Sequence, residues 1–488
     1  MLLISVIIST SYLCESYKIL VVVPKLSYSH MNFMGQIADT LVDAGNDVVS
    51  LQPLLNMNLV GNGTTKSRLI QINPSAELNK SVEEHLAGAV RRNLWTDNTN
   101  NPFGILSFLP TLTRIAYMTV SEALDNKELL RQLEAEKFDV AITELFDFIG
   151  FASFGVTDDS SDFWTRTVNL LFTLASWKFQ CDFAGAVEQA MKMKLGPSAT
   201  PIWDTVSNMT WMLVNSEPLL DYDRPTLHKI VHVGGLGVHE PKPLSKEWDR
   251  VLSLRSTNVL VSFGSVAPTR TMPTDIKSTI VDTIKSHPDI TFIWKYEQLD
   301  DPALADVENL VLSKWTPQTD LLADDRLTLF ITHGGAGSMM ESATFGKPLI
   351  VIPLFGDQIR NAKLIEKFGF GVVVEKSHLL HGTLLNDSLA LVLNNPRYRS
   401  AAARMKSLLS QRPFTPQQKL VKTVEMAAQF GDLPEFKVVG RNLGFVVYYN
   451  LDIIFILSAI FVALVSLLIY FSHLVIRQCH QIAKIKTQ

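Results

Sequence analysis

The chain has 488 residues, of which 47% are apolar and 19% charged, and its 44 basic and 48 acidic side chains give a net charge of −4. This composition excludes a disordered or fibrous chain, because it supplies enough apolar material for one or more sizeable cores. The slight acidity argues against a nucleic-acid-binding protein. Three cysteines are too few for a disulfide framework or a zinc site, and the length predicts about three structural units.

The first residues of the chain form a short apolar run, MLLISVIIST. Small residues, Cys14 and Ser16, follow at the spacing that signal peptidase prefers, so we predict a secretory signal peptide over residues 1–16. The alternative is that this run is the first core strand of a domain. Lys18–Pro24, with the sequence KILVVVP, already supplies that strand, so the signal peptide is favoured.

A second apolar segment lies near the other end of the chain. Ile453–Tyr470 carries no charge, and its 18 residues would span about 27 Å as a helix, close to the thickness of a bilayer core. We predict a transmembrane helix over 450–472, followed by a tail at 473–488. The tail is basic and holds no acidic residue, so the positive-inside rule places it in the cytosol and the bulk of the chain in a secretory lumen.

The basic residues of the tail include Lys484 and Lys486, which resemble the dilysine signal that returns type I membrane proteins to the endoplasmic reticulum. The alternative is that the two lysines only serve the positive-inside rule. We therefore expect a single-pass protein of the endoplasmic reticulum membrane. Four Asn-x-Ser/Thr sequons in the predicted lumenal part are candidate glycosylation sites: Asn62, Asn79, Asn208 and Asn386.

The lumenal part alternates strand and helix patterns twice. An apolar strand (KILVVVP), a helical pattern at Phe33–Val42 and a second strand predict a βαβ opening. The pattern restarts at NVLVSF after the linker HEPKPLSKEW. We predict two α/β domains, at 17–240 and 241–440, each with a doubly wound parallel sheet and with a ligand cleft where the strands end.

A glycine-rich turn lies between the strand LFIT and the next helical pattern, His333-Gly-Gly-Ala-Gly-Ser338. Backbone N–H groups in such a turn can close on an anion, and the helix N-terminus adds about half a positive charge. A diphosphate is the natural ligand. The turn is neither a Walker A loop nor a G-x-G-x-x-G fingerprint, and taken alone it could be no more than a tight turn.

The residues around the turn resemble the signature of the UDP-glycosyltransferase family, particularly the animal UDP-glucuronosyltransferases. The matching residues lie within Trp315–Gln358 and keep the family's order and spacing: Trp315, Gln318, His333, the Gly pair, Ser338, Glu341, Pro353, Asp357 and Gln358. This resemblance covers most of the chain. It implies a GT-B fold, in which two Rossmann-like domains face each other, and an acceptor-binding N-terminal domain beside a UDP-sugar-binding C-terminal domain.

The resemblance also implies a role for each matching residue in binding the UDP-sugar. Uracil would stack on Trp315 beside Gln318, and Glu341 would accept from the ribose hydroxyls. Asp357 and Gln358 would hold the sugar. The residues expected around the diphosphate are Thr332, His333, Gly335, Gly337 and Ser338, with Ser262, Gly264 and Ser265 facing them. In isolation, each of these residues would more often be a core, helix-face or loop residue.

Glycosyl transfer needs a base for the acceptor hydroxyl, and His30 in YSHMNF matches the family's catalytic histidine. Histidine suits this role because it titrates near neutrality. The family orients its histidine with an aspartate, and here the matching position is Glu144, with Asp147 as a fallback. A carboxylate in this position can stabilise the imidazolium. Without the resemblance, His30 would be read as an ordinary loop or helix-cap histidine.

The chain departs from the family after Val156, where tens of residues of the acceptor domain are missing. The sequence is therefore compatible with two alternative functions. The first is an inverting transferase that moves glucuronic acid or glucose from a UDP-sugar to a hydroxyl of a small lipophilic acceptor, without a metal ion or other cofactor. The second is a catalytically inactive, membrane-anchored UDP-sugar-binding protein. Expected partners are the UDP-sugar, the acceptor, the membrane and possible further copies of the chain, but no nucleic acid.

Overall fold

The computed structural model describes residues 16–91, 93–96, 106, 109–144, 161–380 and 383–486. The chain divides into two compact units, residues 1–432 and 433–488. The predicted signal peptide, apart from Ser16, and the segment around Asp147 and Val156 lie outside the described residues.

The first sheet of the larger unit is parallel and has the strand order β3-β2-β1-β4. Apolar side chains alternate between its faces: those of Ile19 and Val21 pack on one face with helices α1 and α14, and Val49 packs on the other with α4. The strands are β1 (Lys18–Val22), β2 (Asp47–Pro53), β3 (Arg68–Ile72) and β4 (Val140–Ile142). The helices in this part of the chain are α1 (Tyr28–Asp43), α2 (Ala76–Arg91), α3 (Leu109–Asp125), α4 (Lys127–Glu136), α5 (Phe163–Leu195) and α6 (Ile202–Asn208).

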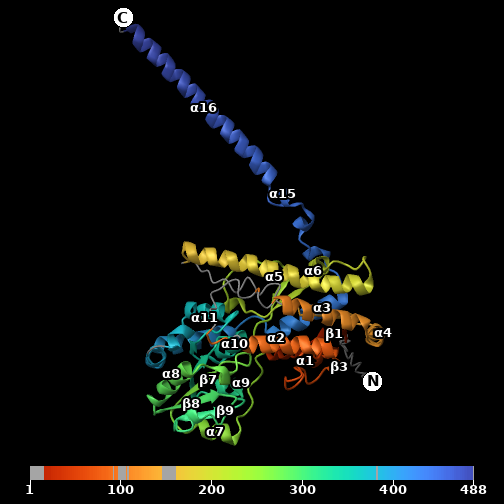
Figure 1. The fold of residues 1–488 in the computed structure, drawn as a ribbon, viewed down its shortest axis with the longest axis vertical. Coiled ribbons are helices and arrows are strands. Elements are labelled where there is room, and N and C mark those ends of the chain that lie inside the picture. Colours follow the sequence, from red (N-terminus) through yellow and green to blue (C-terminus); the bar gives the residue numbers. More distant parts are fainter. Residues whose placement is uncertain are drawn as a thin grey trace, which may run out of the picture. The chain divides into compact units, whose positions relative to one another are not determined.

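The second sheet is also parallel, with the strand order β12-β11-β10-β7-β8-β9. Figure 1 labels three of these strands, β7, β8 and β9. Its strands are β7 (Thr257–Ser262), β8 (Ile290–Lys295), β9 (Leu310–Ser313), β10 (Leu327–Thr332), β11 (Leu349–Val351) and β12 (Gly371–Val373). A small parallel pair, β5 (Met212–Val214) and β6 (Ile230–His232), precedes them. The near-continuous apolar runs predicted as buried strands therefore form the centres of parallel sheets.

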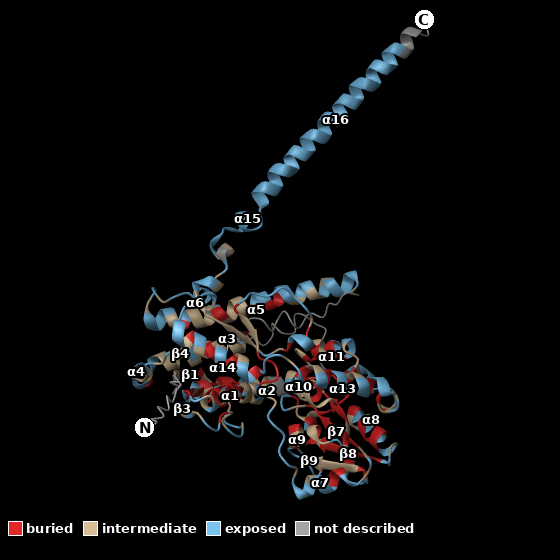
Figure 2. Cartoon of the chain, turned by 180° about the vertical axis from the view of Figure 1, so that it is seen from behind, coloured by how far each residue is buried: buried red, intermediate tan, exposed pale blue. Residues whose placement is uncertain are grey.

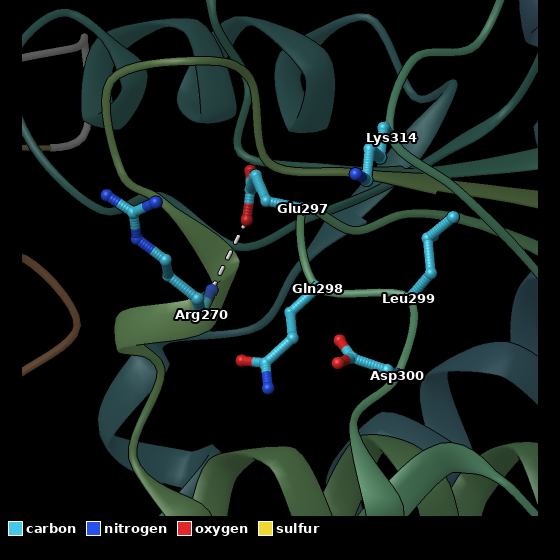
Figure 3. A pocket seen from close by; sticks show the side chains of 6 residues that line it. All are labelled: Arg270, Glu297, Gln298, Leu299, Asp300 and Lys314. Carbon is cyan, nitrogen blue, oxygen red and sulfur yellow. Dashed lines mark hydrogen bonds between the residues drawn. The ribbon is translucent and has the colours of Figure 1, made fainter.

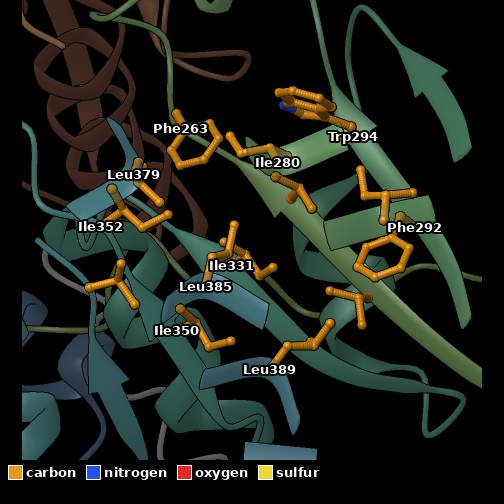
Figure 4. Packing of buried hydrophobic residues seen from close by; sticks show 14 of the residues in the cluster. Phe263, Ile280, Phe292, Trp294, Ile331, Ile350, Ile352, Leu379, Leu385 and Leu389 are labelled. Carbon is orange, nitrogen blue, oxygen red and sulfur yellow. The ribbon is translucent and has the colours of Figure 1, made fainter. Parts of the chain in front are cut away.

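Helices cover both faces of the second sheet. On one face, α8 (Thr274–Lys285) and α12 (Leu384–Asn394) pack against buried aromatic and aliphatic side chains (Figure 4). On the other face lie α7 (Lys246–Leu252), α9 (Gln318–Ala323), α10 (Ala336–Phe345), α11 (Gln358–Lys367) and α13 (Pro396–Ser410). The central strands of this sheet are buried, whereas α5 is exposed along much of its length (Figure 2).

Two segments cross between the sheets. Trp95, which follows α2, is 1% exposed and packs in the core of the second sheet with its ring centroid 5.0 Å from that of Phe263. Helix α14 (Pro416–Phe430) lies in the sequence range assigned to the second domain, yet Leu420 and Val424 pack in the core of the first sheet. The boundary at residue 240 stays a prediction.

The smaller unit contains α15 (Phe445–Tyr448) and α16 (Leu451–Lys486). Within the described residues, one helix is long and apolar enough to cross a membrane, over Leu451–Ile482, and its apolar window is not buried by the rest of the chain. This helix contains the predicted span Ile453–Tyr470 and continues beyond it into the basic tail. A 32-residue helix is about 48 Å long, longer than a bilayer core.

Candidate active site

The predicted diphosphate-binding turns follow two neighbouring strands of the second sheet. Ser262 and Thr332 are the last residues of β7 and β10, they pair directly in the sheet, and both side chains are buried. The loops that follow these strands therefore begin side by side. This register brings Ser262 next to Thr332 and Gly264 next to His333.

The glycines in these loops make room for the His333 ring. Gly264 has a φ of +77°, and a Cβ atom there would lie 2.8 Å from the His333 ring atoms. Gly335 is the N-cap of α10, and a Cβ atom there would lie 2.7 Å from His333 Nε2. Either clash would displace the ring. Beyond this contact, Gly337 and Ser265 are exposed at the mouth of the turn.

Burial lowers the pKa of His333 to about 4, and the nearby Lys295 ammonium acts in the same direction. A hydrogen bond with the Ser262 backbone opposes this shift and indicates that one ring N–H points at that strand end. His333 is therefore a neutral imidazole near pH 7. It can take part in hydrogen bonds at the turn, but it contributes no charge there.

Trp315, which leads into α9, is 56% exposed. Tyr28, the first residue of α1, packs its ring edge-on against Trp315 with the centroids 5.2 Å apart. The Lys295 ammonium lies 5.4 Å from the Trp315 ring centroid. The start of α1 in the first half of the chain thus reaches the predicted uracil platform in the second half.

Glu341, on α10, is held by two hydrogen bonds from the start of α9. The Gln318 amide donates to one carboxylate oxygen, and Thr319 Oγ1 donates to the other at 2.5 Å. The same Gln318 amide also donates to Ser338 Oγ at 3.2 Å. Burial raises the pKa of Glu341. Gln318, Ser338 and Glu341 therefore form one network, and Thr319 is a member that sequence reasoning missed.

Asp357 is the N-cap residue of α11, although its side chain makes no capping hydrogen bond, and burial raises the pKa of its carboxyl group. Asn361 Nδ2 donates to Asp357 Oδ2 at 2.9 Å and to the Gly334 carbonyl at 3.0 Å, so it ties α11 to the glycine turn. Gln358 is buried, and its side-chain carbonyl accepts from the backbone N–H groups of Leu354 and Phe355. Sequence reasoning missed Asn361, although its i, i+4 spacing from Asp357 was a usable signal.

His30 and Glu144 lie together although 114 residues separate them. His30 is the third residue of α1, so it lies within the helix and not in the loop before it. Glu144 follows β4 by two residues, and its carboxylate contacts His30 Nδ1. The His30 side chain remains 40% exposed. Strands β1 and β4 are neighbours in the first sheet, which explains why the chain segments after them meet.

The His30 pair faces the predicted donor residues. The charge of His30 acts on the carboxyl group of Asp357, and that of Glu341 acts on Tyr28, two residues before His30. The ring contact between Tyr28 and Trp315 places the first turn of α1 next to the segment that leads into α9. Residues from both halves of the chain therefore border the predicted cleft.

A hollow of about 460 Å³ lies next to this cleft, beyond the ends of β8 and β9 (Figure 3). Its lining mixes charges of both signs, and Glu297 accepts hydrogen bonds from Thr269 and from the backbone N–H of Arg270. The lining residues are Arg270, Glu297, Gln298, Leu299, Asp300 and Lys314. None of them belongs to the predicted site.

The four sequon asparagines differ in exposure. Asn208, the last residue of α6, is exposed, whereas Asn62, Asn79 and Asn386 are partly buried. The Asn62 carbonyl accepts from Gln52, Asn79 donates to Glu83, and Asn386 accepts from Ser286. Of the four, Asn208 is the most accessible.

The family model described as "UDP-glucoronosyl and UDP-glucosyl transferase" matches this chain over residues 18–153 and 151–486. The chain belongs to this family. The two matched stretches meet near the point where the sequence predicts a shortened segment. The predicted UDP-glycosyltransferase resemblance is confirmed, and the chain is a glycosyltransferase of this family.

Curated relatives span nearly the whole chain. Human UDP-glucuronosyltransferase 1A3 is 26% identical over 483 residues, covering 91% of this chain and 89% of the relative. A Caenorhabditis elegans protein provisionally named UDP-glucuronosyltransferase ugt-48 is 28% identical over 494 residues, covering 91% and 92%. Both alignments extend across the predicted acceptor and donor domains of this transferase.

Solved structures confirm the fold of this glycosyltransferase. The glycosyltransferase of kitacinnamycin has a TM-score of 0.57 at 15% identity, covering 85% of this chain and 99% of its own. The glycosyltransferase VinC in complex with dTDP also has a TM-score of 0.57 at 15% identity, covering 84% and 100%. The predicted GT-B architecture of two facing Rossmann-like domains is therefore confirmed, together with one apolar C-terminal helix that fits a membrane anchor.

Proposed function

We propose that this UDP-glycosyltransferase transfers a hexose from a UDP-sugar to a hydroxyl of a small lipophilic acceptor, with inversion at the anomeric carbon. The observation that carries the proposal is the contact between His30 and Glu144, together with the effect of the His30 charge on Asp357. A histidine backed by a carboxylate is a general base suited to deprotonating a hydroxyl.

The contact between His30 Nδ1 and Glu144 assigns the proton chemistry of the ring. When Nδ1–H donates to the carboxylate, Nε2 is the ring nitrogen that can accept the proton of the acceptor hydroxyl. As it loses this proton, the acceptor oxygen attacks the anomeric carbon from the face opposite UDP. The bond from that carbon to the β-phosphate oxygen breaks, and UDP leaves with the electron pair. Glu144 stabilises the imidazolium that forms.

The donor would lie along the ends of β7 and β10. Trp315 offers a stacking face for uracil, and Glu341 keeps lone pairs for the ribose hydroxyls after accepting from Gln318 and Thr319. The diphosphate fits the turn built from Thr332, His333, Gly335, Gly337 and Ser338, opposite Ser262, Gly264 and Ser265. Asp357 and the amide N–H group of Gln358 would hold the sugar hydroxyls.

We propose that no metal ion takes part. The N-terminus of α10 supplies partial positive charge and backbone donors to the diphosphate. His333 is neutral near pH 7, so it supplies hydrogen bonding to the diphosphate and not the charge that a divalent ion would bring. Glucuronic acid is the favoured sugar because the human relative is named as a UDP-glucuronosyltransferase, with glucose as the alternative.

We place the protein in the endoplasmic reticulum membrane as a glycosylated type I protein with its catalytic part in the lumen. The support is the apolar helix over Leu451–Ile482, the basic tail that follows it, the signal-like residues 1–16 and the exposed sequon at Asn208. Lys484 and Lys486 would act as the retrieval signal.

The test is transfer by the full-length protein in detergent with UDP-glucuronate or UDP-glucose and a panel of phenols. We expect UDP release that depends on the acceptor and a product whose anomeric proton shows the β configuration. Retention of the α configuration would exclude inversion. UDP-sugar binding without release on any acceptor would support the inactive binding protein instead.

A further inference from the structure

Lys295 lies inside the donor cleft although it is outside the signature region. It is the last residue of β8, the strand that pairs with β7 on the side away from β10. Its side chain is only partly exposed. Because ligands of parallel α/β sheets bind at the carboxyl ends of the strands, the position of Lys295 is that of a ligand-binding residue.

The Lys295 ammonium group lies between two parts of the predicted donor site. Its Nζ donates to the Gly264 carbonyl at 2.6 Å, in the loop that faces the His333 turn. The same Nζ lies 5.4 Å from the Trp315 ring centroid, and its charge acts on His333. It is therefore next to both the base platform and the diphosphate turn.

Lys295 carries its positive charge in partly buried surroundings. Within the described part of the chain, no ion pair joins Nζ to a carboxylate, and Glu297 is the acidic residue whose charge acts on it. Burial lowers the pKa of Lys295, so the cation is held in surroundings that disfavour it. A bound anion would relieve that penalty. His333 cannot compete for this role, because it is neutral.

We propose that Lys295 is a donor-binding residue whose ammonium group contacts the diphosphate of the UDP-sugar and of the UDP product. This inference rests on the proposed function, since it takes the cleft as a UDP-sugar site. It adds the full positive charge that the glycine turn and the helix N-terminus lack. A lysine serves well as a point charge for phosphate.

The experiment compares the binding of uridine, UMP and UDP to the full-length protein in detergent by calorimetry. Lys295→Gln removes the charge while keeping a donor for the Gly264 carbonyl, and Lys295→Arg keeps the charge. Lys314→Met is the matched control, because Lys314 is an exposed lysine beside Trp315 that lines the neighbouring hollow. Thermal unfolding of each variant reports whether it is folded, and uridine binding reports whether the base platform at Trp315 is intact.

We expect Lys295→Gln to weaken UDP binding at least about tenfold, as for loss of a hydrogen bond to a charged group, and to change uridine binding less than about twofold. Lys295→Arg should retain most of the UDP affinity, and Lys314→Met should change neither ligand. Equal losses for uridine and UDP, or no loss for either, would overturn the inference. If the wild-type protein itself bound no UDP, the proposed function would fail instead. If Lys295→Gln does not fold, Lys295→Met takes its place. Unchanged UDP affinity of the folded Lys295→Met protein would then overturn the inference.

Discussion

His333 occupies the glycine turn as a neutral imidazole, with a folded-state pKa of about 4 against an ordinary value of 6.5. As the pH falls below 6.5, the unfolded chain takes up the proton first, so the free energy of unfolding decreases until the pH reaches about 4. Between pH 7 and pH 4.5, we predict that the free energy of unfolding decreases by roughly 2 kcal/mol less in His333→Gln than in the wild-type protein. Denaturant titrations of both proteins at the two pH values measure this difference. Equal losses in both proteins would show that His333 titrates normally.

Trp315 is exposed, so its truncation should spare the fold while removing the stacking face for uracil. We predict that Trp315→Ala weakens UDP binding by about 1–3 kcal/mol, the usual scale for losing a base–aromatic stack. Trp315→Phe should recover part of the loss. Calorimetry gives the affinities. Unchanged UDP affinity in a folded Trp315→Ala protein would remove Trp315 from the donor site.

The segment after α2 anchors the first half of the chain in the core of the second sheet. Trp95 fills that core, and its Nε1 donates to the Pro268 carbonyl at 3.5 Å. We predict that Trp95→Ala lowers the free energy of unfolding by about 3–5 kcal/mol, since removal of a large buried aromatic side chain leaves a cavity. Trp164 on α5 is 71% exposed, so Trp164→Ala should cost less than about 0.5 kcal/mol. Comparable losses for the two variants would contradict this packing.

The central strands could be predicted from the sequence, and the connections between distant segments could not. Apolar runs such as NVLVSF and LFIT became β7 and β10 within one or two residues. The edge strands β3, β9 and β12 are short and partly exposed, so their patterns are weak. The return of α14 to the first sheet depends on tertiary packing, which no local pattern records.

In the candidate site too, some residues could be predicted from the sequence and others could not. The signature residues were recognisable because a matching family fixes their order, and the contact between His30 and Glu144 agrees with the predicted pairing. Lys295 and Thr319 were missed because a lysine at a strand end and a threonine in a helix carry no motif of their own. Their place in the cleft follows only from strand register and helix position.

At the scale of the whole molecule, the proposed lumenal orientation places the larger unit in the compartment where oligosaccharyltransferase acts. Asn208 is the most exposed of the four sequon asparagines. We predict that the protein from microsomes shifts in mass on treatment with a peptide N-glycosidase, and that Asn208→Gln removes one glycan. Asn215→Gln, at an exposed asparagine outside any sequon, should leave the mass pattern unchanged. A wild-type protein that shows no shift would contradict the lumenal orientation.

The central claim is that His30 is the base of a glycosyl transfer across the cleft, and the most direct measurement is acceptor-dependent UDP release by His30→Ala. General-base catalysis is worth about 10²–10⁴ in rate, so turnover should fall at least about 100-fold. UDP affinity should stay within about twofold of wild type, because His30 belongs to the acceptor side. His228→Ala, at an exposed histidine away from the cleft, should retain full turnover. Wild-type turnover in His30→Ala would contradict the account and move the base elsewhere, with Glu144 the first residue to test.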